Sequence, residues 1–275
     1  MYMDIKTYPI LDRGDDVSLT AYVAMCDEEL PYNRCRPGVL VCPGGGYAFC
    51  SSREAEPIAL SLLASGYNAF VLNYSCNDYG TNSGRKYPAQ LLEAAESMRI
   101  IKRDAELLRT DPERIFVIGF SAGGHLAASL GILHSSEEVC SAFPGEEKGF
   151  ARPKGMILSY PVITSGNLAH GGSIRNLLLD SYAEQENIEK VSLEKRVGDD
   201  CAPAFIWHTR DDSCVPVENS LLLANALAAH KIDFEMHIYP HGSHGASLGT
   251  PVVGCNNPVL SSWFADAVRW MGGVK

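Results

Sequence analysis

Residues 114–133 read RIFVIGFSAGGHLAASLGIL, and this stretch decides the fold. RIFVIG is an apolar, β-branched run typical of a buried strand, and GGHLAASLGIL has the composition of a helix. Between them stands a G-x-S-x-G pentapeptide with Ser121 at its centre. In such a strand-to-helix turn, glycines two residues to either side keep side chains from colliding with neighbouring backbone. The stretch predicts a strained turn that lifts the Ser121 hydroxyl above the end of a sheet; a plain glycine-rich connection is the alternative.

Short apolar runs alternate with helical patterns along the rest of the chain, which is typical of a mostly parallel sheet covered by helices on both faces. Strands are expected at 17–24, 38–42, 68–74, 114–119, 154–160, 203–208 and 234–239. Helices are expected at 54–65, 88–109, 122–133, 217–230 and 259–272. Within 88–109 the apolar residues recur at helical spacing, and Glu93 is expected on the solvent side. The predicted fold class is therefore α/β.

The length of 275 residues fits a single large α/β domain over 1–275. No internal repeat or low-complexity linker divides the chain. The segment at approximately 164–200 is polar and has only weak helical patterns, at 174–185 and 187–196. Connections of this length are usually functional. We interpret it as a small cap insertion within one domain.

Composition narrows the range of partners. A formal net charge of −10 argues against nucleic acid and anionic membranes, which attract clustered lysine and arginine. The N-terminal stretch lacks an apolar run of signal-peptide length, and no apolar stretch could span a bilayer. The nine cysteines form no C-x-x-C pair and no zinc-type cluster with histidine. We therefore expect free thiols, a cytoplasmic protein, and no metal or organic cofactor.

A second glycine-rich motif, Pro43-Gly44-Gly45-Gly46-Tyr47, directly follows the predicted strand 38–42. Acyl transfer needs N–H donors aimed at a developing oxyanion, and glycine backbone can approach such a charge closely. The predicted donors are Gly45 or Gly46 together with Ala122, the residue after the serine. A phosphate-binding loop is the rival interpretation, but neither G-K-[ST] nor G-x-G-x-x-G is present.

Four motifs in this order carry a family resemblance: PGGGY (43–47), GFSAGGHLA (119–127), HTRDDSCVP (208–216) and GSHG (242–245). The chain resembles the esterase/lipase family close to bacterial acetyl-xylan and feruloyl esterases, and more distantly the hormone-sensitive-lipase group. The resemblance spans about 17–272. The latter group usually has histidine before the glycines, and Pro43 fits the acetyl-xylan-esterase-like branch better. The resemblance implies the α/β-hydrolase fold, with a mostly parallel central sheet flanked by helices.

The acidic member of a triad should follow the strand 203–208, because this fold orders its triad serine, acid, histidine. Asp211 and Asp212 both stand there. The family pattern places the acid three residues before Val-Pro, which implies Asp212. Asp211 stays as the alternative.

The general base is expected in the loop after the strand 234–239, which holds His241 and His244. The Gly-x-His-Gly pattern favours His244, with His241 in reserve. His125, near the start of the helix after Ser121, is interpreted as a packed helix residue beneath the site. The predicted catalytic residues are thus Ser121 as nucleophile, Asp212 and His244.

Three functions are compatible with these residues. The first is a carboxylesterase acting on short acyl esters, acetyl above all, including acetylated oligosaccharides. The second is a serine peptidase or amidase of the same fold, because fold and triad are shared. The third is a non-catalytic binding protein, which the intact triad and glycine loop disfavour. We favour the first, with a small-molecule ester as substrate.

Overall fold

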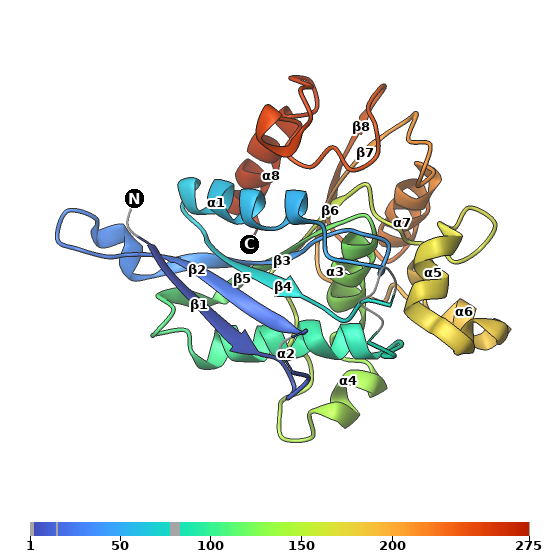
Figure 1. Ribbon diagram of the computed structural model, residues 1–275, viewed down its shortest axis with the longest axis horizontal. Helices are drawn as coiled ribbons and strands as arrows, with labels where there is room; N and C mark the ends of the chain where they lie inside the picture. The colour runs from blue at the N-terminus through green and yellow to red at the C-terminus, as the bar shows by residue number, and fades with distance from the viewer. Residues whose placement is uncertain (1–2, 15, 78–82, 275) are drawn as a thin grey trace.

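The computed structural model describes residues 3–14, 16–77 and 83–274. Within them, eight strands form one mixed sheet at the centre of the molecule (Figure 1). The strands are β1 (Met3–Pro9), β2 (Ser18–Ala24), β3 (Arg36–Cys42), β4 (Asn68–Asn73), β5 (Thr110–Phe120), β6 (Met156–Ser159), β7 (Ala204–Thr209) and β8 (Phe234–Tyr239).

The strand order is β1-β2-β4-β3-β5-β6-β7-β8. β2 pairs antiparallel with both β1 and β4, whereas β4, β3, β5, β6, β7 and β8 run parallel to one another. The carboxyl ends of these parallel strands therefore meet at one edge of the sheet, where α/β folds place their ligand sites. The segments directly after β3, β5, β7 and β8 carry every residue predicted for the site.

Helices cover both faces of the sheet. The α-helices are α1 (Glu56–Ala64), α2 (Ala89–Arg103), α3 (Ala122–Leu133), α4 (Glu137–Ala142), α5 (Gly171–Leu178), α6 (Gln185–Lys190), α7 (Glu218–Ala229) and α8 (Ser262–Gly273). The 3₁₀ helices are η1 (Pro31–Arg34), η2 (Ser52–Glu54), η3 (Leu179–Ala183), η4 (Leu193–Lys195) and η5 (Pro251–Val253). Among the described residues, no helix combines the length and the apolar character that a membrane crossing requires.

The core consists of two apolar clusters, one on each face. On one face α2, α3 and α7 contribute Leu91, Leu126 and Leu223, all buried. On the other face α1 and α8 contribute Ile58 and Trp263. Central strands are mostly apolar where helices cover them on both sides, and β7 is buried at every position. Figure 1 shows α1 and α8 together on one side of the sheet and α2 on the other.

The expected fold class is confirmed, and all seven predicted strands are present within a few residues of their predicted ends. The sequence pattern missed β1, an edge strand whose residues are mostly exposed. It also missed the short helix α4. The predicted helix 88–109 ends at Arg103, and turns lead from there into β5.

The expectation for Glu93 was wrong. Its side chain is fully buried on α2, where it accepts hydrogen bonds from the backbone N–H of Ser75 (2.8 Å) and from the Ser75 hydroxyl, and pairs with Arg13. The helical period places a residue on a face, but it does not reveal that a neighbouring loop covers that face.

The segment 164–200 leaves the sheet after β6 and returns before β7. It contains α5, η3, α6 and η4, and α5 and α6 lie together at one end of the molecule (Figure 1). Ile174, Leu177 and Leu178 are buried in the apolar cluster of α2, α3 and α7, whereas Leu179 is half-buried. Three apolar side chains of α5 thus dock this segment on the body of the protein.

Candidate active site

Ser121 lies in a strained turn between β5 and α3, with φ +53° and ψ −117°. Glycine is required on both sides of it. A Cβ on Gly119 would stand 2.1 Å from the carbonyl oxygen of Gly123, and a Cβ on Gly123 would stand 2.1 Å from the carbonyl oxygen of Cys42. These distances are far shorter than any van der Waals contact, so the G-x-S-x-G spacing is a steric requirement of the turn.

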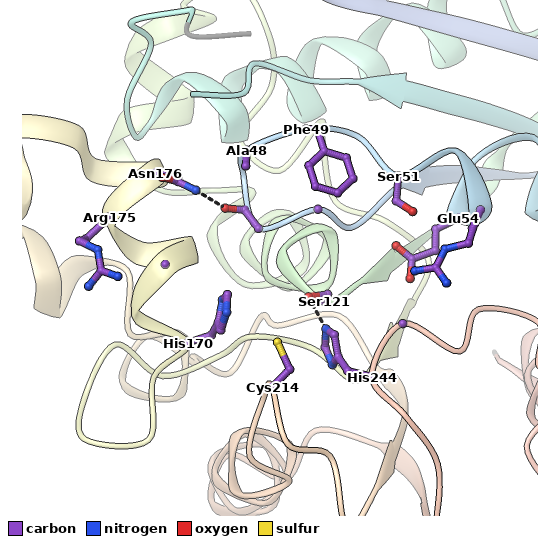
Figure 2. Close-up of a pocket in the computed structure, with 15 residues that line it drawn as sticks. Ala48, Phe49, Ser51, Glu54, Ser121, His170, Arg175, Asn176, Cys214 and His244 are labelled. Carbon is purple, nitrogen blue, oxygen red and sulfur yellow. Dashed lines mark hydrogen bonds between the residues drawn. The ribbon is translucent and has the colours of Figure 1, made fainter. Parts of the chain in front are cut away.

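Three side chains from separate loops form one hydrogen-bonded row at the sheet edge. His244 Nε2 lies 2.9 Å from Ser121 Oγ, and His244 Nδ1 lies 2.7 Å from Asp212 Oδ2 (Figure 2 shows the first of these bonds). The structure therefore brings together the three residues that the sequence singled out. An imidazole placed between a hydroxyl and a carboxylate can accept the hydroxyl proton and keep its other N–H on the carboxylate.

Asp212 is held as a carboxylate. Its second oxygen, Oδ1, accepts the backbone N–H groups of Cys214 (2.8 Å) and Val215 (2.9 Å). Burial by itself would raise the pKa of Asp212, but hydrogen bonds from His208 and His244 hold it well below its usual range. The group facing His244 is thus an anion at neutral pH.

His208 extends this row behind Asp212, although no sequence motif assigns it to the site. It is fully buried on β7, with Nε2 3.3 Å from Asp212 Oδ2 and 3.0 Å from the carbonyl oxygen of Val215. Its Nδ1 lies 2.8 Å from Ser220 Oγ. The signal in the sequence was a histidine in an apolar strand, four residues before the acid.

The alternative pair, Asp211 and His241, interacts separately. His241 Nδ1 lies 2.9 Å from Asp211 Oδ2, and the backbone N–H of Gly242 donates to Asp211 Oδ1 (2.9 Å). The His241 side chain is 75% exposed, whereas that of His244 is 18% exposed. Asp211 and His241 thus join two loops at the surface, beside the row that contains Ser121.

The glycine loop after β3 is a strained segment with free donors. Gly45 has φ +125° and Gly46 has φ +66°, and a Cβ on Gly45 would lie 2.0 Å from the carbonyl oxygen of Phe49. The N–H of Gly44 donates to Glu54 Oε2 (2.9 Å). Within the described part of the chain, no protein group accepts the N–H of Gly45 or of Gly46. These two donors are available to a ligand.

Two further contacts brace the same loop. The Asn176 side chain, on α5, donates to the carbonyl oxygen of Gly46 (2.9 Å; dashed in Figure 2). The Tyr47 hydroxyl lies 2.9 Å from His125 Nδ1, and His125 Nε2 lies 2.9 Å from the carbonyl oxygen of Val191. His125 is fully buried beneath the site, and its burial lowers the pKa to about 4. His125 is therefore a neutral packed residue, as its place in the sequence suggested.

A cavity of about 520 Å³ opens over Ser121 and His244. Its walls come from the glycine loop, from η2, from the segment around α5 and from the loops after β7 and β8. Figure 2 shows His170 and Cys214 on one side of Ser121, and Phe49 and Ala48 on the other. Arg53 and Arg175 also line it, so the cavity is bordered by polar as well as apolar groups.

His170 faces the site from the segment before α5. Its Nδ1 lies 2.8 Å from Ser173 Oγ, which fixes the ring at the start of the helix. Burial and the nearby His244 and Arg175 lower the pKa of His170. His170 stands in no sequence motif, so no pattern in the sequence marks it as a site residue. Among the described residues, no group of three or more His, Cys, Asp or Glu side chains is arranged to hold a metal ion.

Comparisons with known proteins show the family to which the chain belongs. A family model described as BD-FAE matches residues 30–227, more than half of the chain. Endo-1,4-beta-xylanase B of Butyrivibrio fibrisolvens is 39% identical over 228 residues, which are 83% of this chain and 34% of that protein. The acetylxylan esterase of Xylanibacter ruminicola is 29% identical over 226 residues, 80% of this chain and 43% of that protein. The chain thus spans less than half the length of either curated relative.

Among solved structures, the acetyl ester-xyloside bifunctional hydrolase of Caldicellulosiruptor lactoaceticus superposes with a TM-score of 0.80 at 35% identity. The match covers 94% of this chain and 88% of that one.

Proposed function

The chain belongs to the BD-FAE family of α/β-hydrolase carboxylic ester hydrolases, and on that premise we propose that it is a serine esterase for short acyl groups. The acyl group is acetyl or propionyl, the alcohol is a sugar of a small oligosaccharide, and the acyl-enzyme forms on Ser121. The observation that carries the proposal is the row Ser121–His244–Asp212, with bonds of 2.9 and 2.7 Å, at the base of a cavity.

The reaction runs in two halves. His244 Nε2 takes the Ser121 proton as the oxygen attacks the ester carbonyl, and the proton then passes to the departing alcohol. Water enters, His244 takes its proton, and the hydroxide attacks the acyl-serine to release the carboxylic acid and return the proton to Ser121. In both halves the Asp212 carboxylate keeps the imidazole in the required tautomer and stabilises its positive form.

The oxyanion of each tetrahedral intermediate is held by backbone donors. Ala122 opens α3, so its N–H has no partner within the helix and stands beside the reacting serine. The free N–H groups of Gly45 and Gly46 supply the donors from the opposite loop. No metal or organic cofactor enters this chemistry.

The segment 164–200 is the cap that bounds the substrate. Its residues His170, Arg175 and Asn176 face the cavity, and its buried leucines point into the body of the protein instead. A polar border suits a sugar hydroxyl surface and offers no long apolar trough for a fatty chain. One relative is named an acetylxylan esterase and another an acetyl ester-xyloside bifunctional hydrolase, which supports a carbohydrate alcohol.

A reducing, cytoplasmic setting belongs to the same proposal. All nine cysteines lie in the described part of the chain and are free thiols. Counting reactive thiols in the unfolded protein purified without reductant should return nine; a lower count that reductant restores would argue against this setting.

Replacement of Ser121 by alanine tests the proposed chemistry. Loss of a triad member typically lowers turnover by several orders of magnitude, so Ser121→Ala should hydrolyse p-nitrophenyl acetate at less than about a thousandth of the wild-type rate. An organophosphate should label Ser121 in the wild type, as mass spectrometry of the peptide would show. A folded Ser121→Ala protein with a tenth of wild-type activity would reject the proposal. Acetylated xylo-oligosaccharides and a matched p-nitroanilide then distinguish a sugar esterase from an amidase.

A further inference from the structure

Glu54 borders the active-site cavity yet lies outside the row of Ser121, His244 and Asp212. It ends η2, and only 3% of its surface is exposed. Both of its oxygens accept hydrogen bonds, Oε2 from the N–H of Gly44 (2.9 Å) and Oε1 from the hydroxyl of Tyr160 (2.5 Å). A buried carboxylate is expensive unless such partners are present, and here the partners come from two different loops.

We propose that Glu54 is a positioning residue that holds the glycine loop and the histidine loop in place around Ser121. This role rests on the proposed function, because it concerns the same reaction. Among the described residues, Glu54 hydrogen-bonds neither to the Ser121 hydroxyl nor to the His244 ring. Its hydrogen bonds reach the site through Gly44 and Tyr160.

The first of these groups is the backbone of the glycine loop. A Cβ on Gly44 would lie 2.5 Å from Glu54 Oε2, 2.9 Å from the carbonyl oxygen of Phe120 and 3.2 Å from Ser121 Cβ. Gly44 is therefore packed directly between the carboxylate and the reacting serine. The N–H of Gly44 donates to Glu54, so this bond fixes the orientation of the backbone just before Gly45 and Gly46. Misplacement of a donor by about 1 Å can cost about 100-fold in rate.

The second group is the Tyr160 side chain, which leads to the histidine loop. Its hydroxyl accepts the N–H of Ser247 (2.9 Å), and its ring packs edge-on against His244, with ring centroids 5.0 Å apart. Ser247 Oγ donates in turn to the carbonyl oxygen of Arg53 (2.7 Å). The loop that carries His244 is thereby tied back to the residue beside Glu54. Tyr160 (φ +38°) and Ser247 (φ +50°) both have strained backbones, which the network holds in place.

The charge of Glu54 also faces the base. Burial raises the pKa of Glu54, while the bonds from Tyr160 and Gly44 and the nearby charges of His244 and Arg53 oppose that rise. Ionised Glu54 places a negative charge on the side of the His244 ring that faces η2.

Other charged groups approach the same ring from other elements. Asp212 faces His244 from the loop after β7, and His170 faces it from the segment before α5. A second anion at the ring favours the protonated imidazole that forms during proton transfer.

Replacement of Glu54 by glutamine tests the proposal. Glutamine keeps the volume, but its amide can accept from only one of the two donors and presents N–H to the other. We expect kcat for p-nitrophenyl acetate to fall about 10- to 100-fold, with KM within about twofold. The acid limb of the pH dependence of kcat/KM should also move to lower pH, because a negative charge facing the base has been removed. A purely structural role would leave that midpoint in place.

Glu93→Gln is the matched control. Glu93 is an equally buried carboxylate with a backbone N–H and a hydroxyl as donors, but it does not line the cavity. We expect its variant to lose thermal stability while kcat at 25 °C stays within about twofold. Tyr160→Phe keeps the ring on His244 and removes one bond to Glu54, so we expect a smaller fall in kcat, about 3- to 10-fold, and this variant carries the test if Glu54→Gln does not fold.

The outcomes separate this proposal from the proposed function. A folded Glu54→Gln enzyme with wild-type kcat and an unchanged pH midpoint overturns the positioning role, while Ser121→Ala still decides the chemistry. Equal losses of kcat in Glu54→Gln and Glu93→Gln would also overturn the positioning role, since the loss would then come from destabilisation of the fold by removal of any buried carboxylate. A folded Tyr160→Phe enzyme with wild-type kcat would contradict the link to the histidine loop.

Discussion

Replacing Asp212 by asparagine separates the two neighbouring aspartates by their chemistry. Asp212 accepts two backbone N–H groups at Oδ1 and His244 at Oδ2. Asparagine can keep its carbonyl oxygen on the backbone donors, because those two bonds demand an acceptor. Its NH₂ group then faces His244 Nδ1 and forces that nitrogen to act as acceptor. The proton moves to Nε2, which can no longer take the proton of Ser121.

The size of the effect follows from this reversal of the tautomer. In serine proteases the corresponding change lowers kcat by about 10⁴-fold with the geometry intact, which is about 5.4 kcal/mol of transition-state stabilisation. The bonds from Cys214 and Val215 hold the side chain of residue 212 in the same orientation here, so we expect a loss of 10³- to 10⁴-fold in kcat for Asp212→Asn. KM should change little, because Asp212 does not line the cavity.

The assay is the initial rate of p-nitrophenyl acetate hydrolysis at pH 7.5, with circular dichroism to confirm folding. Asp211→Asn is the matched control: it makes the same chemical change at a carboxylate that binds His241 and Gly242, and its activity should stay within about threefold of wild type. A folded Asp212→Asn enzyme with a tenth of wild-type kcat would refute the reasoning. An inactive Asp211→Asn enzyme would transfer the role to the other pair.

Three more predictions follow from the same geometry. His244→Ala should lower kcat at least about 10³-fold, whereas His241→Ala should keep most of the activity, and rates of the two purified variants decide between them. His125 has its pKa lowered to about 4, so the unfolded state binds its proton first as pH falls. The contribution of His125 to the free energy of unfolding should be fully present above about pH 6.5. It should fall by about 3 kcal/mol as the pH is lowered toward 4. Urea unfolding at pH 7 and 4.5 should show a smaller loss of unfolding free energy in His125→Asn than in the wild type. An equal loss in both proteins would contradict a buried, neutral His125. Finally, kcat/KM over p-nitrophenyl esters from C2 to C12 should be highest at C2 or C3. In a deep acyl tunnel, burial of each added methylene would instead contribute about 0.8 kcal/mol and raise kcat/KM about fourfold. A steady rise of kcat/KM from C2 to C8 would reject the short-acyl proposal.

Local patterns predicted most of the fold. Continuous apolar runs marked the covered strands, and the glycines around Ser121 marked the turn, because steric demands on φ and on close packing act over a few residues. The edge strand β1 was missed because an exposed strand lacks an apolar signature. Glu93 was misplaced for a related reason. Its burial comes from Ser75 and Arg13, which lie far from it in the sequence.

The site was predictable as a set of candidates, and its assignment remains a prediction. Two aspartates and two histidines followed neighbouring strands, and the choice between them rested on a family resemblance. Their pairing depends on the parallel register of β7 and β8, in which Thr209 stands opposite Tyr239. That register sets Asp211 beside His241 and Asp212 beside His244. Sequence spacing cannot supply the register, because it is decided by hydrogen bonds between strands and by packing against the helices.

The sequence by itself determined the sharp turn at Ser121, the glycine loop and most of the strands and helices along the chain, since each depends on neighbours within one element or turn. Only the tertiary structure decided that Asp212 and His244 form the row with Ser121, that His208 lies behind Asp212, and that Glu54 meets Tyr160. Glu54 and Tyr160 stand 106 residues apart in the chain. The physical reason is that a hydrogen bond depends on distance and direction in space, and these exist only once the sheet has brought the ends of its strands to one edge.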